Sequence, residues 1–388
     1  MPARDDAGRV VGVQLESWSA APGALTMGVE EEYLLLEADS GRIAPFGHEV
    51  ADDAAALLGP RAQTEYQSYQ VEGATEVCGS SAELRASITA MRRALAAAAE
   101  RAGARLMAVA VPLADPAPPH RPTPNPRYRL LHDTYRELLE EQTQCGCHVH
   151  IGLDDPAAAV RVSNHLRLWL PSLLALTANS PIYRGRDTGY ASWRAILWSR
   201  WPVVGPTPYL ESPEHWTALR DAVIEGGAVP EERMLYWDIR PSTHVPTLEI
   251  RTCDVPLTVD ESVLTALLVR AIATQALNGH DEAVAVPQEL LRAAYWRAAR
   301  DGLEGYGMDP ATGRLMPATD LLARLLAWVT PALVRDGVAD QVEAMVKAVR
   351  VEGNGAVRQR AALARRGRLE DVIDLIERHS AARETPGI

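Results

Sequence analysis

One short run of residues constrains the fold of this chain more than any other. Residues 145–152 read CGCHVHIG, where the polar His148 and His150 alternate with the apolar Val149 and Ile151. An alternation of period two is typical of a β-strand with one polar and one apolar face. It predicts both histidines on the polar face, with Cβ atoms about 6.5–7 Å apart. For this strand alone, a metal or phosphate site and a pair of structural histidines are both open interpretations.

A second predicted strand begins with three acids. Residues 28–36 read GVEEEYLLL, so Glu30 and Glu32 share one face of a strand and Glu31 lies on the other. Carboxylates on one face repel each other unless a cation lies between them. The pattern therefore indicates a metal site, and a solvated strand end is the alternative interpretation.

A third predicted strand has the same design. Residues 247–251 read TLEIR, which places Glu249 and Arg251 on one face and Leu248 and Ile250 on the other. Three strands from distant parts of the chain thus each offer polar groups on one face, which predicts a shared metal centre. The alternative for Glu249 and Arg251 is an ion pair at a sheet edge.

The order of the predicted elements indicates the fold class. Strands dominate the first part of the chain with helices interleaved, and the last third is mostly helical. This order predicts an α+β fold with a mainly antiparallel sheet. A chain of 388 residues that is 47% hydrophobic can bury a large core. We expect a flexible extension over residues 1–24 and one domain over residues 25–388.

Several individual elements follow from periodicity and caps. Ser80 and Glu83 form a capping-box pattern, which predicts a helix over residues 80–102. The other predicted elements are extended chain at residues 65–77, a strand at 104–113, and helices at 49–58, 128–142, 156–179 and 260–277. Residues 180–208 combine tryptophans with arginines in a loop, which indicates either the lining of a pocket or a solvated surface.

Charge and missing motifs exclude several classes of function. The formal net charge of −12 disfavours non-specific binding to nucleic acid or to an anionic membrane. No G-x-G-x-x-G pattern occurs, and because Lys347 is the only lysine a P-loop is impossible. No stretch approaches 18 uncharged apolar residues, and residues 1–16 lack the apolar part of a signal peptide. We therefore expect a cytoplasmic protein.

The four cysteines do not predict a disulfide framework in a chain of this length. Cys145 and Cys147 precede the two histidines, but four ligands within six residues of one strand cannot surround a tetrahedral zinc ion. Residues 187–189 read Asp-Thr-Gly like an aspartic protease, yet there is no second copy of the triplet. A tetrahedral zinc site and an aspartic protease are therefore both disfavoured.

Seven stretches taken together resemble one family. The chain is similar to the carboxylate–amine ligases of the glutamate–cysteine ligase type 2 family, relatives of glutamine synthetase. The matching stretches are residues 28–33, 145–152, 178–181, 187–192, 237–242, 247–251 and 353–360. They follow the family order over nearly the whole chain.

The resemblance implies a fold and an activity. The fold is glutamine synthetase-like, with a curved, mainly antiparallel sheet that forms a metal-lined funnel flanked by helices. The activity is ATP-dependent amide formation through an acyl-phosphate, with release of ADP and phosphate. Glutamate is the expected acid, and cysteine is the amine that the family name suggests. A phosphotransferase of the guanidino-kinase type and a non-catalytic metabolite sensor are the alternatives, and we expect a homo-oligomer, specifically a dimer.

The resemblance also implies ligands for Mg²⁺, with Mn²⁺ as a further option. The implied ligands are Glu30, Glu32, Glu65, Glu72, His148 and Glu249. Glu65 and Glu72 are seven residues apart and would face opposite ways on a regular strand, so a turn or bulge must separate them. Glu76 shares the side of Glu72 and is the alternative ligand.

The remaining implied roles concern the nucleotide and the substrates. The implied nucleotide contacts are His150, Arg240, Arg251, Asn354 and Arg358. The implied substrate contacts are Asn179, Asp187, Thr188, Tyr190 and Arg194. Catalysis is assigned to Glu30, Glu249 and Arg251, because attack of a carboxylate on ATP brings anions together that metals and arginine must neutralise. A plain helix cap is the alternative for residues 353–355.

Overall fold

A seven-stranded sheet forms the centre of the computed structural model, which describes residues 24–38, 40–114, 122–140, 142–242, 245–279 and 282–382. The strand order is β10-β11-β5-β1-β3-β2, with β4 also paired with β1. Its strands are β1 (Met27–Glu37), β2 (Ala62–Thr64), β3 (Gln70–Ala74), β4 (Ala104–Met107), β5 (Gly146–Gly152), β10 (Ile239–Pro241) and β11 (Thr247–Asp254). All their pairings are antiparallel, which confirms the predicted α+β class with an antiparallel sheet.

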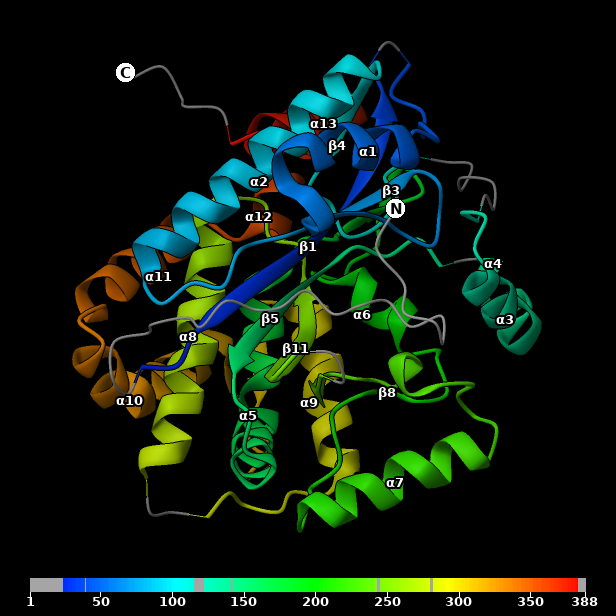
Figure 1. Ribbon diagram of the computed structural model, residues 1–388. Coiled ribbons are helices and arrows are strands. Elements are labelled where there is room, and N and C mark those ends of the chain that lie inside the picture. The colour runs from blue at the N-terminus through cyan, green and yellow to red at the C-terminus, as the bar shows by residue number, and fades with distance from the viewer. Residues whose placement is uncertain are drawn as a thin grey trace.

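Helices surround this sheet, and β1, β5 and β11 cross the middle of the molecule (Figure 1). The helices of the first half are α1 (Gly47–Leu58), α2 (Ser81–Arg101), α3 (Pro126–Tyr135), α4 (Glu137–Glu140), α5 (Pro156–Thr177) and α6 (Trp193–Trp198). Those of the second half are α7 (Pro213–Glu225), α8 (Val259–Asn278), α9 (Gln288–Asp301), α10 (Ala318–Arg335), α11 (Ala339–Glu352), α12 (Gly355–Arg366) and α13 (Leu369–Ser380). Three small sheets pair β6 (Ile182–Tyr183) with β7 (Arg186–Asp187), β8 (Val204–Gly205) with β9 (Tyr236–Trp237), and β12 (Tyr306–Met308) with β13 (Leu315–Pro317).

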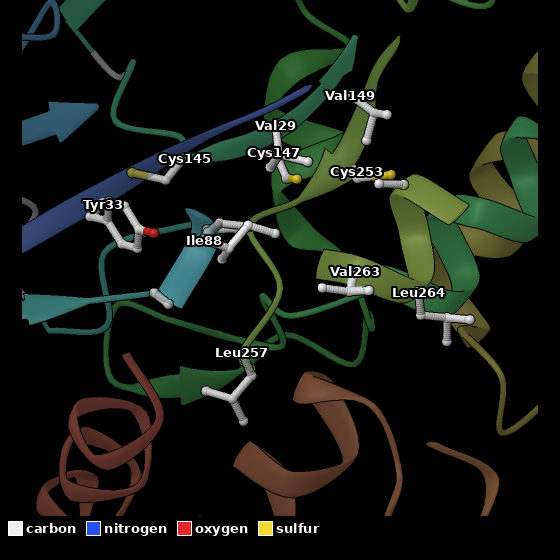
Figure 2. Close-up of a cluster of buried hydrophobic side chains, with 14 of the residues drawn as sticks. Val29, Tyr33, Ile88, Cys145, Cys147, Val149, Cys253, Leu257, Val263 and Leu264 are labelled. Atoms are coloured by element: carbon white, nitrogen blue, oxygen red, sulfur yellow. The ribbon is translucent and has the colours of Figure 1, made fainter. Parts of the chain in front are cut away.

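The apolar face of the central sheet packs against helices α2, α5 and α8. Figure 2 shows Val29 of β1 and Cys147 of β5 in one buried cluster with Val263 of α8. Each of these side chains is at most 1% exposed. Alternation along each strand therefore leaves the opposite face of the sheet to the polar residues.

A buried ion pair lies within this apolar side. The carboxylate of Glu31 accepts hydrogen bonds from Nε and Nη2 of Arg92 at 2.9 and 2.7 Å, and from the hydroxyls of Tyr33 and Ser262. Burial opposes the ionisation of Glu31, but the guanidinium of Arg92 outweighs it and lowers the pKa of the carboxyl. The pair connects β1 with α2 and, through Ser262, with α8. Glu31 thus lies on the face opposite to its two neighbours, as the alternation predicts.

Most predicted helices are confirmed to within a few residues, including the capping box before α2. Three predicted elements differ, and one of them is the extended segment at residues 65–77, which a turn divides. The strand predicted at residues 104–113 ends with β4, because the backbone N–H of Ala108 donates to Oγ of Ser380 instead of to a neighbouring strand. The helix predicted at residues 128–142 is divided into α3 and α4 at Arg136, whose φ of 50° does not fit a right-handed helix.

Two predictions concern the N-terminal extension and the number of domains. The extension predicted for residues 1–24 lies, apart from residue 24, outside the described residues. The assignment of residues 25–388 to one domain stays a prediction. No helix within the described ranges combines the length and the apolar character that a bilayer crossing requires.

Candidate active site

Strand pairing brings the polar faces of β1, β5 and β11 together. Glu30 of β1 lies opposite His148 of β5, and His150 of β5 lies opposite Glu249 of β11. These residues were predicted to share a face within their own strands, and the antiparallel pairing places the three faces side by side. The predicted strands and their polar faces are therefore confirmed.

A cavity of about 440 Å³ opens over this polar face, and we call it the central pocket. Its acids and histidines are Glu30, Glu32, Glu65, Glu72, His148, His150 and Glu249. Its arginines are Arg127, Arg194, Arg233, Arg240 and Arg251. The six implied metal ligands thus line one cavity, together with four of the implied nucleotide and substrate contacts. Arg127 and Arg233 belong to no predicted motif.

Carboxylate and imidazole groups converge around Glu30. Nδ1 of His148 lies 3.3 Å from Glu30 Oε2 and 3.7 Å from Glu249 Oε1. Nε2 of His150 lies 3.3 Å from Glu30 Oε1. Two sets of ligand atoms lie within 4.8 Å of one another, namely Glu30 with His150 and Glu249, and Glu30 with Glu72 and His148. Carboxylates with a few imidazoles fit Mg²⁺ or Mn²⁺, and no cysteine of the described residues belongs to these sets.

Glu65 and Glu72 line the central pocket together because a turn separates them. Residues 65–77 were predicted as one extended segment, but β2 ends before Glu65 and β3 begins five residues after it. The reversal brings both carboxylates to the same side. Glu72 also lies opposite Glu32 in the pairing of β3 with β1. The turn that the seven-residue spacing required is therefore confirmed.

Glu76, the alternative to Glu72, does not line the central pocket. Its carboxylate lies 3.2 Å from Nη2 of Arg61, and its side chain is 62% exposed. Of the two acids, Glu72 is the one placed among the other predicted ligands.

Two acids of the central pocket are held close to other acids. Burial raises the pKa of Glu72 well above its usual value, and neighbouring Glu30 and Glu65 raise it further. Burial and Glu32 likewise raise the pKa of Glu65. A divalent cation among these groups would favour their ionised forms and so reverse both shifts. The residues present therefore fit the metal ions that the family resemblance implies.

Glu249 lies between two arginines. Nη2 of Arg240 is 2.6 Å from Oε2 of Glu249, and Arg251 forms an ion pair with the other carboxylate oxygen. Burial opposes ionisation of Glu249, but Arg251 and Arg240 outweigh it and lower its pKa to about 2. Nε of Arg251 is buried without a hydrogen-bond partner. The ion pair considered as the alternative interpretation is thus present, and it lies within the central pocket instead of at a solvated edge.

His150 was implied as a phosphate contact, yet its position also suits a metal ligand. Its Nδ1 lies 3.0 Å from Oγ1 of Thr247, which orients the ring so that Nε2 faces Glu30. Burial lowers the pKa of His150, but the carboxylate of Glu30 outweighs burial and raises it. The role of this histidine in phosphate binding stays a prediction.

Two asparagines that the resemblance implied as ligand contacts lie outside the central pocket. Nδ2 of the fully buried Asn179 donates to the carbonyls of Ala108 and Val255. The side chain of Asn354 accepts from the backbone N–H of Val357 and caps α12. Asn354 therefore forms the helix cap that was the alternative interpretation for residues 353–355. The side chains of Asn179 and Asn354 both form hydrogen bonds within the protein.

Four other implied contacts are also absent from the lining of the central pocket: Arg358, Asp187, Thr188 and Tyr190. Arg358 forms an ion pair with Glu261 of α8. Asp187 accepts from Nε of Arg360 at 2.9 Å, which anchors the β6–β7 segment to α12. The structure does not bring these residues together with the ligand cluster, and their roles in binding stay predictions. Arg194 is the one implied substrate contact that lines the central pocket.

Five aromatic side chains line the central pocket, and we call them the aromatic wall: Tyr66, Tyr128, Trp198, Trp201 and Tyr236. The ring of Tyr236 lies 5.0 and 5.1 Å from the rings of Trp198 and Trp201, and Tyr66 lies 5.2 Å from Tyr128. A pocket lining was one of two open interpretations for the tryptophans of residues 180–208, and it is confirmed for Trp198 and Trp201 but not for Trp193, which does not line the central pocket. The three tyrosines belong to no motif that could have predicted them.

A mostly apolar groove of about 410 Å³ adjoins the central pocket. The two cavities share Glu30, His150 and Val245. The groove continues past Gly28 of β1 and Gly152 of β5, and no arginine of the described residues lines it. The ligand cluster therefore lies between an arginine-rich cavity and an apolar one.

This combination of fold and site defines a class of protein. An antiparallel sheet that presents acids and histidines for divalent ions, with arginines for anionic substrates, is the arrangement of a carboxylate–amine ligase with a glutamine synthetase-like fold. The chain belongs to glutamate–cysteine ligase family 2, whose model matches residues 26–376. It is therefore an ATP-dependent ligase that forms a C–N bond, as the resemblance implied.

Relatives with a similar sequence support this assignment. A protein of Mycobacterium sp. strain KMS with the provisional name glutamate–cysteine ligase 2-2 is 47% identical over 357 residues, which cover 90% of this chain and 97% of the relative. A protein of Saccharopolyspora erythraea with the provisional name glutamate–cysteine ligase 2-1 is 46% identical over 358 residues, which cover 90% and 93%. The resemblance found in the sequence motifs is thus confirmed over most of the chain.

Solved structures share the fold at low sequence identity. The glutamate–cysteine ligase of Francisella tularensis in complex with AMP has a TM-score of 0.66 at 13% identity, over 93% of this chain and 90% of that one. A bifunctional glutathione synthetase of Pasteurella multocida has a TM-score of 0.65 at 17% identity, over 92% of this chain and 52% of that one. These similarities confirm the fold class.

Proposed function

We propose that this enzyme uses ATP and Mg²⁺ to activate the γ-carboxylate of glutamate and joins it to the amine of a second amino acid, such as cysteine. The observation that carries the proposal is the convergence of acids, histidines and arginines around Glu30 and Glu249. Family membership supports the ATP-dependent chemistry, and the related Francisella tularensis enzyme was crystallised with AMP.

The side chains that would hold the divalent ions are the six predicted ligands. They are Glu30, Glu32, Glu65, Glu72, His148 and Glu249. When bound, Mg²⁺ supplies positive charge that neutralises the phosphate oxygens of ATP. The fit rests on the two sets of converging ligand atoms and on the raised pKa values of Glu65 and Glu72. Mn²⁺ is an alternative because imidazole nitrogens belong to both sets.

Arg251 and Arg240 would position and neutralise the transferring phosphoryl group. Both guanidinium groups are directed to Glu249 and are mostly buried, so their charges act with little screening by water. The unpaired Nε of Arg251 leaves a donor for an incoming oxygen. Planar guanidinium groups suit the oxygens of a phosphoryl group, which can accept two parallel hydrogen bonds.

The two cavities beside the ligand cluster suggest how the substrates are arranged. The apolar groove suits the adenosine part of ATP, because a base packs against apolar surface and the ribose hydroxyls can meet polar side chains such as Thr75 and Asp154. The central pocket suits glutamate, because Arg127 and Arg233 can meet its α-carboxylate. The γ-phosphate and the γ-carboxylate would then meet at Glu30, which lines both cavities.

The reaction would proceed in two steps. A γ-carboxylate oxygen of glutamate attacks the γ-phosphorus of ATP, and the bond to the bridging oxygen breaks to release ADP. The neutral amine then attacks the carbonyl carbon of the acyl-phosphate, the C–O bond to phosphate breaks, and the nitrogen loses a proton. The arginines stabilise the negative charge that moves from carboxylate to phosphate in both steps.

The proposal is tested by measuring ADP and phosphate release with glutamate and a panel of amines. We expect ADP release that needs glutamate and an amine, with a γ-glutamyl amide as the product. Hydroxylamine should trap the activated acid as a hydroxamate. A phosphotransferase of the guanidino-kinase type would instead leave the phosphate on its product, and a sensor would bind nucleotide without turnover. Either result would overturn the proposed ligase reaction.

Two broader expectations remain part of this proposal. We expect the enzyme to work in the cytoplasm, where ATP and free glutamate are available. We also expect a homodimer, which light scattering of the purified chain would detect. The proposed reaction in the central pocket depends neither on the location of the enzyme nor on its oligomeric state.

A further inference from the structure

A third cavity, of about 230 Å³, adjoins the central pocket, and we call it the side pocket. Arg194 and Trp198 line both cavities and so form the partition between them. The cation of Arg194 lies over the ring of Trp198, 5.8 Å from its centroid. Most of the remaining lining of the side pocket is apolar, and it includes Leu174, Ile196, Val204, Pro206, Trp296 and Ala299.

One acid faces this apolar cavity. Asp238 lines the side pocket, is 3% exposed, and forms no ion pair among the described residues. Burial raises its pKa to about 6, so the carboxyl is ionised at neutral pH. A buried carboxylate is costly unless a cation or hydrogen-bond donors satisfy it. The hydroxyl of Tyr295 lies beside Asp238 and lowers its pKa, but it carries no charge, so a ligand with a positive charge would supply the missing charged partner.

Four other polar atoms of the same lining lack a hydrogen-bond partner among the described residues. They are Nε of Arg194, Nε1 of Trp198, Oγ1 of Thr252 and the hydroxyl of Tyr295, and all four are buried. Arg194 and Thr252 are 3% and 4% exposed. Unpaired buried polar groups are rare in folded proteins, and several in one cavity indicate a missing ligand. Two of the four are N–H donors, which suit a carboxylate.

We propose that the side pocket binds a free α-amino acid with an apolar side chain. Its ammonium group would meet Asp238, and its carboxylate would meet Nε of Arg194 and Nε1 of Trp198. Its side chain would occupy the apolar part of the lining. An amine would leave both N–H donors unpaired, and a fatty acid would leave Asp238 without a charged partner.

The bound amino acid can be used in two ways. As an acceptor, it would be joined to glutamate across the partition that Arg194 and Trp198 form. As an effector, it would stay intact and change the rate through the same two side chains. The chemistry of recognition is the same in both cases, and product analysis distinguishes them.

The direct test is calorimetric titration of the full-length enzyme with L-leucine. Isopentylamine and 4-methylpentanoate serve as comparators, because each keeps the apolar chain and only one charged group. We expect one molecule of leucine per chain and binding at least about tenfold weaker for both comparators. Saturating glutamate with Mg²⁺ and ADP, which do not support turnover, should not displace leucine, and this result would place leucine outside the central pocket.

Variants of the lining locate the bound leucine. D238N should weaken binding about 10- to 100-fold, because it removes a charged hydrogen-bond acceptor. A195L should prevent binding by filling the side pocket, and W296A should weaken it; both positions line only this cavity of those described above. The matched controls are D336N, which removes an acid paired with Arg270 elsewhere, and V351A on the exposed side of α11. Both controls should bind leucine like the parent enzyme.

Specific outcomes would overturn the inference. These are an absence of leucine binding at millimolar concentration, or binding that A195L and W296A leave unchanged. If D238N fails to fold, these two variants at partly exposed positions still decide the question. Mass spectrometry of reactions with glutamate and ATP then shows either γ-glutamyl-leucine or intact leucine with an altered rate, and both support the site. Loss of the proposed ligase reaction would leave leucine binding untouched, so the two failures are distinguishable.

Discussion

His148 and Glu30 are direct cross-strand partners, and Nδ1 of the histidine lies 3.3 Å from Oε2 of the glutamate. The two residues are 118 positions apart in the chain, yet both belong to paired strands at the centre of the sheet. Hydrogen bonding between the strands, and not a loop, therefore sets the spacing of these ligand atoms. Sites built on such elements hold their geometry more accurately than sites on loops.

The three acids of β1 should separate into two functional classes. Glu30→Gln and Glu32→Gln should abolish ATP turnover without unfolding the protein, because their side chains face the central pocket. Glu31→Gln should destabilise the fold by about 3–5 kcal/mol, because it leaves Arg92 buried without its charged partner. ADP release and thermal unfolding of the three variants provide the measurements.

One outcome would contradict the placement of Glu31 on the apolar face of β1. If all three variants lose turnover with unchanged unfolding temperatures, Glu31 would belong to the site. Arg92→Met with Glu31→Leu provides a control, because replacing both partners by apolar groups removes the unpaired charge. This double variant should recover part of the stability and keep turnover.

Activity should require Mg²⁺ or Mn²⁺ and should not be supported by Zn²⁺ alone. The converging ligand atoms are carboxylate oxygens and imidazole nitrogens, whereas Cys145 and Cys147 are free and fully buried. The metal-stripped enzyme should regain ADP release on addition of Mg²⁺. Restoration by Zn²⁺ alone, combined with inactivation by alkylation of these cysteines, would contradict the assignment.

Arg251→Lys should lower kcat steeply and raise the KM for ATP only modestly. Arginines that stabilise a transferring phosphoryl group contribute roughly 10³–10⁵ in rate, and a lysine cannot reproduce their planar pair of donors. Steady-state kinetics with varied ATP gives both constants. Near-normal kcat with weak binding of ATP or glutamate would make Arg251 a ground-state anchor, and Arg240 or His150 would then be the catalytic candidate.

The metal-free enzyme should lose stability as the pH rises above 4.5. The pKa values of Glu65 and Glu72 are raised from 4.5 in the folded state, so this state binds more protons than the unfolded chain. The stability from their protonation is complete below pH 4.5 and is lost as the pH rises through the raised pKa values. Glu249, with a lowered pKa, is ionised in both states above pH 4.5 and does not offset this loss.

The measurement is the thermal unfolding midpoint between pH 4.5 and 8 in chelator. Addition of Mg²⁺ should raise the midpoint most at the upper end of this range, where the ligands are ionised. Glu72→Gln should flatten the fall, because the variant cannot lose a proton at this position. A midpoint that rises with pH in the parent enzyme would contradict the expected electrostatics.

The sequence predicted the chemical core of the site because that core is periodic. Alternation on β1, β5 and β11 fixes which face each acid or histidine occupies, and the antiparallel sheet needs only the pairing of the strands to complete the cluster. Glu65 shows the limit of this reasoning. Its seven-residue spacing from Glu72 required a turn between them, but the spacing did not predict where the turn lies. Family resemblance supplied the set of ligands that periodicity alone left open.

The remainder of the site depends on contacts that have no local signal. Tyr66, Tyr128 and Tyr236 come from separate segments and meet only through tertiary packing. Asn354 shows a second limit, because a matching motif implied a ligand contact at a position where the side chain caps a helix, and its role in binding stays a prediction. A family motif contains residues that shape the fold as well as those that bind substrates, and the sequence does not separate the two.

The buried pair of Glu31 and Arg92 also has a consequence for how the protein reaches its active form. A slip of one residue in the pairing of β1 would turn Glu30 and Glu32 into the apolar layer and expose Glu31 to the ligand cluster. Arg92 would then lose the carboxylate of Glu31 while staying buried, at a cost of several kcal/mol. The buried pair therefore favours the register that directs Glu30 and Glu32 to the ligand cluster, and this preference does not depend on a bound metal.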